Sequence, residues 1–555
     1  MDNIRQNLSR SRVVLLIGIF LSTIFFLSRP FSSTHTSSRE TYNYAVPLHV
    51  ANQTSPKRIA IVGAGASGSA AAFFLRRAAR VAEDRSGLAR GSLLGEIVVI
   101  DKADYVGGRS TTVFPHSDPR IRGVELGASI FVDANRNMMK AAKYFNLTVQ
   151  DPDFSEAGVG IWDGSKFLFT TSTSSGRLAS WWDAFGAIRR YGPLSPYRSK
   201  QMVARLLAKF ANLYDPLWLS EREAARSIED FAERLGLGTE LTMRAADEWA
   251  VNTVGVGDKW MGEIMEGSTR VNYALDMDKI HALGASVSMA AAGASAIEGG
   301  NWRVFQAMLE DSKATVRLNT EVKEIVPVKK HGAADPSFLV RTSASSIADE
   351  KPYDQVFFAA PWHLSSVSKS LETHFVEPIP QQHYVRLHVT LLTTTQPRPL
   401  ASFFSLPESA IIPTTILTTN VHARNAPGKL PPKFQSLTYH GETFPGSGEW
   451  VVKIFSISRM NDHILTAIFG EEPTWLLRKI WDSYPILRPI EKYAPVEPMK
   501  GLQYLAALEP WVSTMETQTL SAREAVGRVV QDWWGLGMGE CRGGNDAWDW
   551  TCKGK

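Results

Sequence analysis

Cysteine is nearly absent from this chain. Its 555 residues include only two, Cys541 and Cys552, and no CxxC pair, so neither a thiolate zinc site nor a dithiol redox centre is indicated. No HExxH or serine–histidine–aspartate signature occurs, which argues against zinc-dependent or triad-based hydrolysis. We therefore expect no bound metal. The two cysteines predict a disulfide closing a C-terminal loop, with two free thiols on a frayed tail as the alternative.

An excess of one charge is also lacking. The chain carries 60 lysines and arginines against 56 aspartates and glutamates, a formal net charge of +4. No basic run stands out, so nucleic acid is not an expected partner. With 44% hydrophobic and 21% charged residues, the composition is that of a globular protein. The length predicts about two to four folding units.

One long apolar run lies near the N-terminus. Residues 13–28 read VVLLIGIFLSTIFFLS and follow a basic segment, residues 1–12. The run predicts a signal peptide or a signal anchor. Basic residues before it predict a cytoplasmic N-terminus, with the remainder in the secretory lumen, the vacuole or lysosome, or outside the cell. If the run is not cleaved, we expect a single-pass type II membrane protein. An oxidising compartment of this kind favours the disulfide.

A polar stretch separates this run from the folded part. Residues 29–57 are rich in Ser, Thr, Asn and Pro and predict a flexible stalk. The sequons at Asn52 and Asn146 fit a luminal, glycosylated protein. The folded part is expected to begin at Arg58.

A glycine-rich turn follows the first expected strand, residues 59–62. The turn GAGASG leads into an alanine-rich helical stretch. In such a turn the first glycine allows a sharp bend, the second lets a pyrophosphate approach the backbone, and the third lets the helix pack on the strand. The free N–H groups at the helix start then hold the anion. The residues expected to do this are Gly63, Gly65, Ala66, Ser67 and Gly68.

A second apolar strand, residues 96–100, ends at Asp101. An acidic residue there is placed to accept the ribose hydroxyls of a dinucleotide. The spacing from the glycine turn is longer than usual, and we interpret residues 83–95 as a surface insertion. Strand, turn, helix and acid together predict a Rossmann-like dinucleotide-binding unit.

The sequence after Asp101, KADYVGGRSTT, resembles the amine-oxidase branch of FAD enzymes. The later segment ELGAS, residues 125–129, resembles the small-residue turn near the isoalloxazine in that branch. The resemblance implies FAD as the cofactor. The residues it adds to the predicted cofactor site are Lys102, Gly107, Gly108, Arg109, Glu125, Gly127, Ala128 and Ser129.

Later segments resemble further parts of the same architecture. In VRLNTEVKEI, Val322 would contact the adenine through its backbone. YDQVFFAAPWH resembles a later strand and small-residue turn. QYLAALEP resembles the last flavin motif, in which Glu509 would reach the ribityl chain or the pyrophosphate. The usual glycine before that acid is Leu508 here.

A narrower resemblance joins RVNY, residues 270–273, through an alanine- and glycine-rich run to EGGN, residues 298–301. This order is similar to the prenylcysteine oxidase (prenylcysteine lyase) family, over most of residues 58–535. The resemblance implies FAD-dependent oxidation of farnesyl- or geranylgeranyl-cysteine, with oxygen as acceptor, to a prenyl aldehyde, cysteine and hydrogen peroxide, in prenylated-protein degradation. The small-residue run 282–296 would leave room for the isoprenoid.

The expected fold class is α/β, with a Rossmann-like FAD-binding domain and an interleaved α+β substrate-binding domain. Residues 316–328 and 383–395 are expected to form strands, and 536–555 a C-terminal tail. The FAD-binding domain is assigned to residues 58–150, 296–365 and 496–535, and the substrate domain to residues 151–295 and 366–495.

Candidate catalytic residues are scarce. His383 is the one candidate, to place water or substrate. His388 lies five positions further along the same expected strand, so the two side chains face opposite sides and form no metal pair. Two other functions stay open: a different flavin oxidase, acting on amines or desaturating isoprenoids, and a non-catalytic prenyl-binding chaperone.

Overall fold

The computed structural model describes most of the chain. The expected segments 1–12 and 13–28, most of 29–57, and the sequon at Asn52 lie outside the described residues. Within the described part, no helix has both the length and the apolar character needed to span a membrane, and no cluster of metal-ligating side chains occurs. The described residues are 48, 50, 53, 55–151, 158–172, 177–291, 293–329, 335–344, 351–367, 371–426, 428–541 and 547–552.

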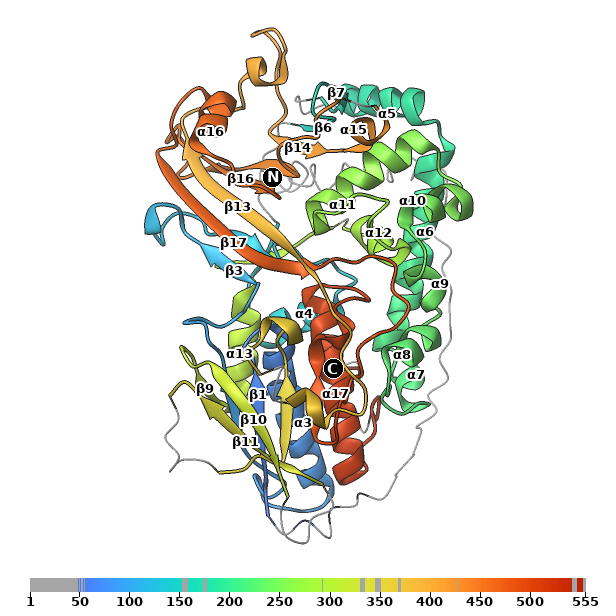
Figure 1. The fold of residues 1–555 in the computed structure, drawn as a ribbon, viewed down its shortest axis with the longest axis vertical. Helices are drawn as coiled ribbons and strands as arrows, with labels where there is room; N and C mark the ends of the chain where they lie inside the picture. Colours follow the sequence, from blue (N-terminus) through green and yellow to red (C-terminus); the bar gives the residue numbers. More distant parts are fainter. Residues whose placement is uncertain are drawn as a thin grey trace, which may run out of the picture.

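A five-stranded parallel sheet forms the lower half of the molecule in Figure 1. The inner strands are largely apolar because both faces of the sheet are covered there, whereas the edge strand, residues 315–317, is exposed at two of its three positions. Strand β1 lies at the centre. In sheet order the strands are β18 (Leu502–Tyr504), β12 (Gln355–Phe358), β1 (Lys57–Val62), β2 (Leu94–Ile100) and β9 (Thr315–Arg317).

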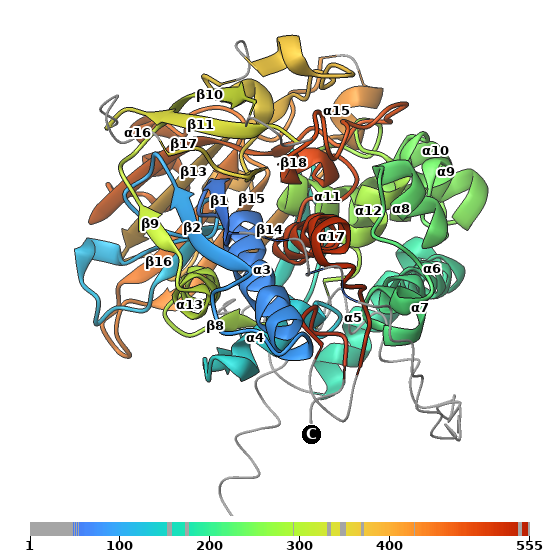
Figure 2. The same ribbon diagram turned by 90° about the horizontal axis from the view of Figure 1, so that it is seen from below.

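Helix α3 (Ala66–Arg85) runs between α13 (Trp302–Ser312) and α17 (Met515–Trp534) and contacts both, as Figure 2 shows. The run from Ala70 to Phe74 in α3 is completely buried. The helix therefore lies in the core, and this burial holds its N-terminal turn against β1. The other elements near this half are β3 (Thr111–Val113), β4 (Val124–Gly127), α4 (Arg136–Tyr144), β5 (Val149–Gln150), β8 (Ala296–Ile297), β10 (Val322–Val328) and β11 (Ser337–Thr342).

The expected strand 316–328 is in fact two strands in different sheets, β9 and β10. Asn319 adopts a left-handed conformation (φ 52°) and breaks the run, which a short polar side chain tolerates. The break lets Asn319 N donate to Ala103 O at 2.8 Å and Thr320 N donate to Asp101 O at 2.8 Å. The interruption thus braces the end of β2.

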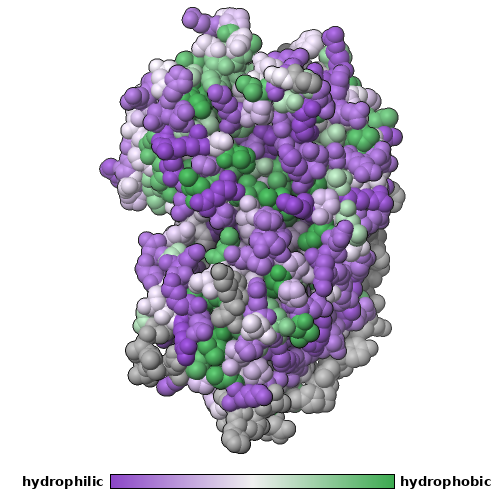
Figure 3. Space-filling model, viewed as in Figure 1, coloured by the Kyte–Doolittle hydropathy of each residue, from purple (hydrophilic) through white to green (hydrophobic). Residues whose placement is uncertain are grey.

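A seven-stranded mixed sheet forms the upper half. It is antiparallel except where β14 pairs with β6, and the long strands β13 and β17 reach down toward the parallel sheet (Figure 1). In Figure 3, hydrophobic residues gather on the surface of the upper half, just above the constriction between the two halves. In sheet order the strands are β17 (Trp475–Pro485), β13 (Tyr384–Thr394), β16 (Trp450–Ser456), β15 (Ser436–Glu442), β14 (Thr415–Thr418), β6 (Val159–Trp162) and β7 (Phe167–Thr170).

Helices cover one side of this half. The small-residue run expected to leave open space forms α12 (Ala282–Ser288), and a Cβ on Gly284 would lie 3.1 Å from Ile280 and Leu487 side-chain carbons. The α12 part of the run therefore packs as core, since small residues let neighbouring elements approach, whereas a Cβ on Gly293 would meet no atom within 4 Å. The remaining helices are α5 (Arg177–Tyr191), α6 (Leu194–Ala211), α7 (Pro216–Ser220), α8 (Ile228–Arg234), α9 (Thr239–Thr242), α10 (Ala246–Trp249), α11 (Glu266–Tyr273), α15 (Val421–Asn425) and α16 (Asp462–Phe469).

The C-terminal tail is part of the core. Cys541 and Cys552 form the predicted disulfide. Trp548 and Trp550 are 1% and 4% exposed and pack on Phe73 and Phe74 of α3, with the rings of Trp550 and Phe73 4.6 Å apart. The described part of the tail therefore closes over the N-terminal half of α3.

Candidate cofactor site

The turn between β1 and α3 has the geometry of an anion-binding loop. Gly63 has φ +108°, a conformation that favours glycine. A Cβ on Gly68 would lie 1.9 Å from Gly63 O, so only glycine lets α3 start this close to β1. The first N–H groups of α3, at Ala66 and Ser67, have no partner within the helix and carry its positive end.

A second glycine turn lies against the first. Gly107 N donates to Ala64 O at 2.9 Å, and Gly107 and Gly108 both have positive φ. A Cβ on Gly65 would lie 3.8 Å from Gly108 Cα, with no closer neighbour. The two turns therefore face each other with bare backbone, and a side chain on Gly65 would fill the cradle that a pyrophosphate needs.

Asp101 ties the first turn to the end of β2. Its Oδ2 accepts from Ala64 N at 2.7 Å and its Oδ1 accepts from Ala103 N at 2.8 Å. A carboxylate has about four acceptor positions, so both oxygens keep capacity for ribose hydroxyls. Lys102 is exposed beside it. Val322 is buried at the start of β10, and its carbonyl accepts from Ser366 Oγ at 3.2 Å.

The ELGAS and EGGN turns are clamped together. Asn301 N donates to Glu125 Oε1 at 2.6 Å, and Asn301 Nδ2 donates to Ala128 O at 2.8 Å. Burial raises the pKa of Glu125 to about 7. A Cβ on Gly127 would lie 2.8 Å from the Trp481 ring, so the turn also packs directly on β17. EGGN therefore acts as a structural partner of the flavin motif.

Lys453 reaches the same turn from β16. Its ammonium donates to Glu125 O at 2.9 Å and to Ser129 Oγ at 3.1 Å. The residue is 7% exposed, and burial lowers the pKa of this lysine to about 8. An ammonium has three donors, so one is left for another acceptor.

Arg109, Glu509 and Tyr384 meet at the end of the parallel sheet. The guanidinium of Arg109 pairs with the Glu509 carboxylate and also donates to Ser483 O at 2.9 Å. Tyr384 donates to Glu509 Oε2 at 2.8 Å. Burial, followed by the adjacent carboxylate, holds the pKa of Tyr384 well above its usual value, so the phenol stays a donor. The structure thus brings together two predicted cofactor residues that are four hundred positions apart.

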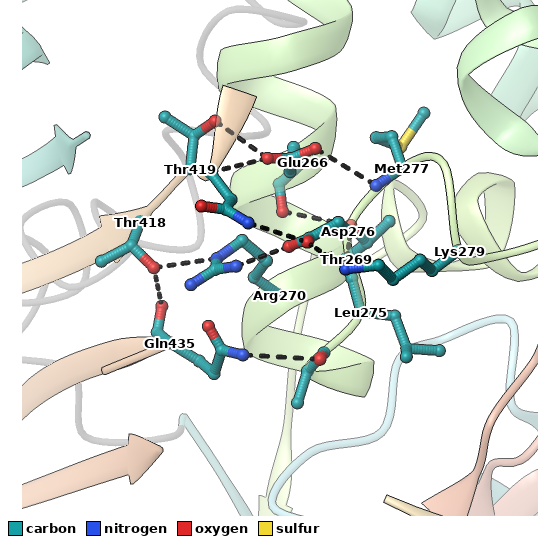
Figure 4. A network of polar contacts seen from close by, with 12 residues as sticks. Glu266, Thr269, Arg270, Leu275, Asp276, Met277, Lys279, Thr418, Thr419 and Gln435 are labelled. Atoms are coloured by element: carbon teal, nitrogen blue, oxygen red, sulfur yellow. Dashed lines mark hydrogen bonds and ion pairs between the residues drawn. The ribbon is translucent and has the colours of Figure 1, made fainter. Parts of the chain in front are cut away.

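The RVNY segment, at the end of α11, connects the helices to the seven-stranded sheet. Arg270 is buried and donates to Asp276 Oδ1 at 2.5 Å and to Thr418 Oγ1 at 3.0 Å, as Figure 4 shows. Glu266, one turn earlier in α11, accepts from Thr419 Oγ1 at 3.0 Å. These contacts join α11 to the end of β14. RVNY therefore fixes the helix layer on the seven-stranded sheet.

Two histidines lie near the site: His383, the predicted candidate, and His281, which the sequence analysis did not name. His383 is exposed just before β13, one residue from Tyr384, and its catalytic role stays a prediction. His281 is completely buried: Gly284 N donates to its Nδ1 at 3.0 Å, so Nε2 carries the proton and donates to Pro510 O at 3.0 Å. Burial lowers the pKa of His281 to about 4. The neutral His281 side chain therefore links the start of α12 to Pro510, the residue after Glu509.

Two site residues that the sequence analysis missed, Lys453 and His281, could have been identified from their sequence context. Lys453 interrupts the apolar run VVKIF, and a charge inside a buried strand calls for a partner. His281 stands directly before α12, where caps occur. Tyr384 gave no signal, because its partner Glu509 is distant in sequence.

Buried polar atoms around these turns fit a large polar ligand. Ser110 Oγ, Trp481 Nε1 and both amide atoms of Gln518, in the first turn of α17, have no hydrogen-bond partner among the described residues. Buried polar groups are normally paired. Ser110 adjoins the second glycine turn and Trp481 contacts the ELGAS turn. Unpaired donors there are what the polar groups of FAD would satisfy, and the role of each single residue stays a prediction.

Comparisons with known proteins agree with this geometry. A family model described as prenylcysteine lyase matches residues 175–536, and one described as an NAD(P)-binding Rossmann-like domain matches residues 61–145. Farnesylcysteine lyase of Arabidopsis thaliana is 26% identical over 496 residues, 86% of this chain and 88% of that protein. Prenylcysteine oxidase 1 of Homo sapiens is 26% identical over 491 residues, 86% and 90% of the two chains.

A solved putrescine oxidase mutant has the same fold, with a TM-score of 0.51 at 14% identity, covering 86% of this chain and 99% of that one. The paired glycine turns, the family match and these relatives together define an FAD-dependent oxidoreductase, and its architecture is mixed α/β. Within that class, the chain belongs to the prenylcysteine lyase family, whose model matches more than half of it.

Proposed function

We propose that the protein oxidises the thioether of a prenylated cysteine such as farnesyl- or geranylgeranyl-cysteine. The observation that carries this proposal is the family match over residues 175–536, which includes both the RVNY helix and the EGGN turn. In the balanced reaction the thioether, water and dioxygen give a prenyl aldehyde, cysteine and hydrogen peroxide. Such a reaction belongs to the breakdown of prenylated proteins.

Bound FAD supplies an acceptor for a hydride from the prenyl carbon next to sulfur. That allylic C–H bond is already activated, so the protein has chiefly to orient the substrate and exclude bulk water. Lys453 keeps a positive charge beside the ELGAS turn at neutral pH, because the pKa of its buried ammonium, about 8, is still above 7. Arg109 and Tyr384 hold the Glu509 carboxylate in one position.

The interior between β13, β17 and the helices suits an apolar substrate. Buried or half-buried apolar side chains pack there into one cluster that reaches Trp481, which contacts the ELGAS turn. An amine substrate would instead need polar or aromatic recognition of a compact head group. The cluster includes Met261, Ile264, Met265, Met277, Leu387, Leu477 and Trp481.

The direct experiment is turnover by the purified, flavin-loaded full chain. Farnesyl-cysteine and geranylgeranyl-cysteine should each yield hydrogen peroxide, free cysteine and aldehyde in equal amounts. Putrescine and cyclohexylamine serve as matched amine controls and should yield none. Peroxide from the amines alone would make this chain an amine oxidase. Tight prenyl binding by a colourless protein would instead favour a chaperone.

A luminal or extracellular location is part of the proposal. The disulfide suits an oxidising compartment, and Asn146 of the second sequon is exposed after α4. Expressed in a eukaryotic secretory host, the protein should lose mass on glycosidase treatment, and Asn146→Gln should reduce that loss. An unglycosylated protein whose folded part is digested by protease in sealed microsomes would place it in the cytosol.

A further inference from the structure

Helix α5 exposes an aromatic face to solvent. Trp181 and Trp182 are 71% and 70% exposed, Phe185 51% and Ile188 47%. Residues 181, 185 and 188 share one side of the helix, with 182 next to them. We call these four residues the aromatic patch. Two adjacent tryptophans this exposed are unusual, because tryptophan is mostly buried in soluble proteins.

The opposite side of α5 is anchored to the fold. Ala187 and Tyr191 are buried, and the ring of Tyr191 contacts Phe169 of β7. Arg190 pairs with the buried Glu263, Nε to Oε2 at 2.6 Å. The helix is therefore held with its aromatic patch outward, at the upper edge of Figure 1 beside β7.

Basic side chains are exposed on α5 itself and on two segments at the same end of the molecule, the β6–β7 turn and the loop after α15 (Figure 1). Arg189 on α5 and Lys166 in the β6–β7 turn are exposed. The loop after α15 lies against that turn, where a Cβ on Gly164 would be 3.0 Å from Leu430 O. Leu430 is 80% exposed, and Lys429 and Lys433 flank it, both exposed.

Two carboxylates at this end, Asp163 and Asp183, accept backbone hydrogen bonds. Asp163 accepts from Ser165 and Lys166 backbone N–H groups, and Asp183 accepts from Ser172 N at 2.8 Å. This end of the molecule therefore combines tryptophan, phenylalanine and aliphatic groups with exposed lysine and arginine side chains. That combination binds the interface of an anionic bilayer, where aromatic rings enter the headgroup layer and lysines meet lipid phosphates.

We propose that the aromatic patch, with its rim of Lys166, Arg189, Lys429 and Lys433, docks the folded domain on an anionic membrane surface. The choice of a membrane rests in part on the proposed function, since a prenylcysteine partitions into lipid. A second copy of the chain would need complementary negative charge, which this basic surface does not offer to itself. The docked helix brings the substrate half of the enzyme to the phase that holds its substrate.

The test uses the full chain with a nitroxide label on Trp182→Cys. The native cysteines are paired and do not react. With vesicles of phosphatidylcholine and phosphatidylserine, collisions with oxygen should rise severalfold relative to collisions with a water-soluble nickel chelate. A label on Val376→Cys, 90% exposed near the parallel sheet, is the control and should show no change. With pure phosphatidylcholine the rise at Trp182→Cys should be much smaller.

An unchanged collision ratio at Trp182→Cys on anionic vesicles would overturn the proposal. A label already shielded without lipid would also overturn it, with dipolar broadening indicating a second copy and no broadening indicating another segment of this chain. An equal rise on neutral vesicles would remove the basic rim from the proposal. If Trp182→Cys fails to fold, Phe185→Cys repeats the measurement. These readings need no turnover, so they are independent of the peroxide assay.

Discussion

Gly65→Leu should give a folded, colourless protein. Gly65 has φ −81° and ψ −167°, which any residue adopts, so the backbone is not strained. A Cβ meets no protein atom closer than 3.8 Å, and the side chain would occupy the cradle between the two glycine turns. The absorbance spectrum of the purified variant should lack the flavin bands, while its far-ultraviolet circular dichroism matches wild type.

Gly68→Ala is the contrasting variant. Its Cβ would lie 1.9 Å from Gly63 O, so α3 would have to move off β1, and we expect little soluble protein. Gly87→Ala is the matched control, since nothing lies within 4 Å of its Cβ. Its positive φ costs about 1–2 kcal/mol, and flavin should be retained. A Gly65→Leu protein with a full complement of flavin would show that the pyrophosphate lies elsewhere.

Trp550→Ala should destabilise the parallel-sheet half by about 3–5 kcal/mol, the usual cost of removing a buried tryptophan. The Trp550 ring contacts Phe73, Phe74, Tyr144 and Phe145, so its removal leaves a cavity against α3 and α4. The measurement is the urea concentration at which flavin is released, which should fall clearly below that of wild type.

Trp182→Ala is the control for that change, because an exposed tryptophan contributes about 0.5 kcal/mol or less to folding. Reduction of the disulfide, or Cys541→Ser, should lower the free energy of unfolding by about 2–3 kcal/mol for so short a loop. The urea midpoint should therefore fall less than it does for Trp550→Ala. Equal midpoints for Trp550→Ala and wild type would mean that the tail contributes nothing to the stability of α3.

Local features of the site could be predicted from the sequence. The glycine turn, Asp101 and the Gly107–Arg109 segment each lie within a few residues of the strand that positions them, so pattern and propensity suffice. The α/β class followed from the same alternation of strand and helix. The disulfide was indicated by the two cysteines and by the apolar N-terminal run.

Contacts between distant segments could not be predicted in this way. The clamp between Glu125 and Asn301, and the pairing of Arg109 with Glu509, depend on how three separate parts of the chain come together. For the run 282–296 the sequence alone could not distinguish an open channel from close helix packing, because small residues fit both equally well, and the packing is close at α12. The break at Asn319 depends on a bond to Ala103, more than two hundred positions earlier.

The strand order of the parallel sheet limits when the protein can become active during its synthesis. The central strand β1 pairs with β12, almost three hundred residues later, and β12 pairs with β18. Strand β6 of the other sheet likewise waits for β14. Contacts this far apart form slowly. The last strand of the seven-stranded sheet, β17, precedes β18 and α17 in the chain. The parallel-sheet half with the cradle is therefore completed last, after Glu509 has emerged.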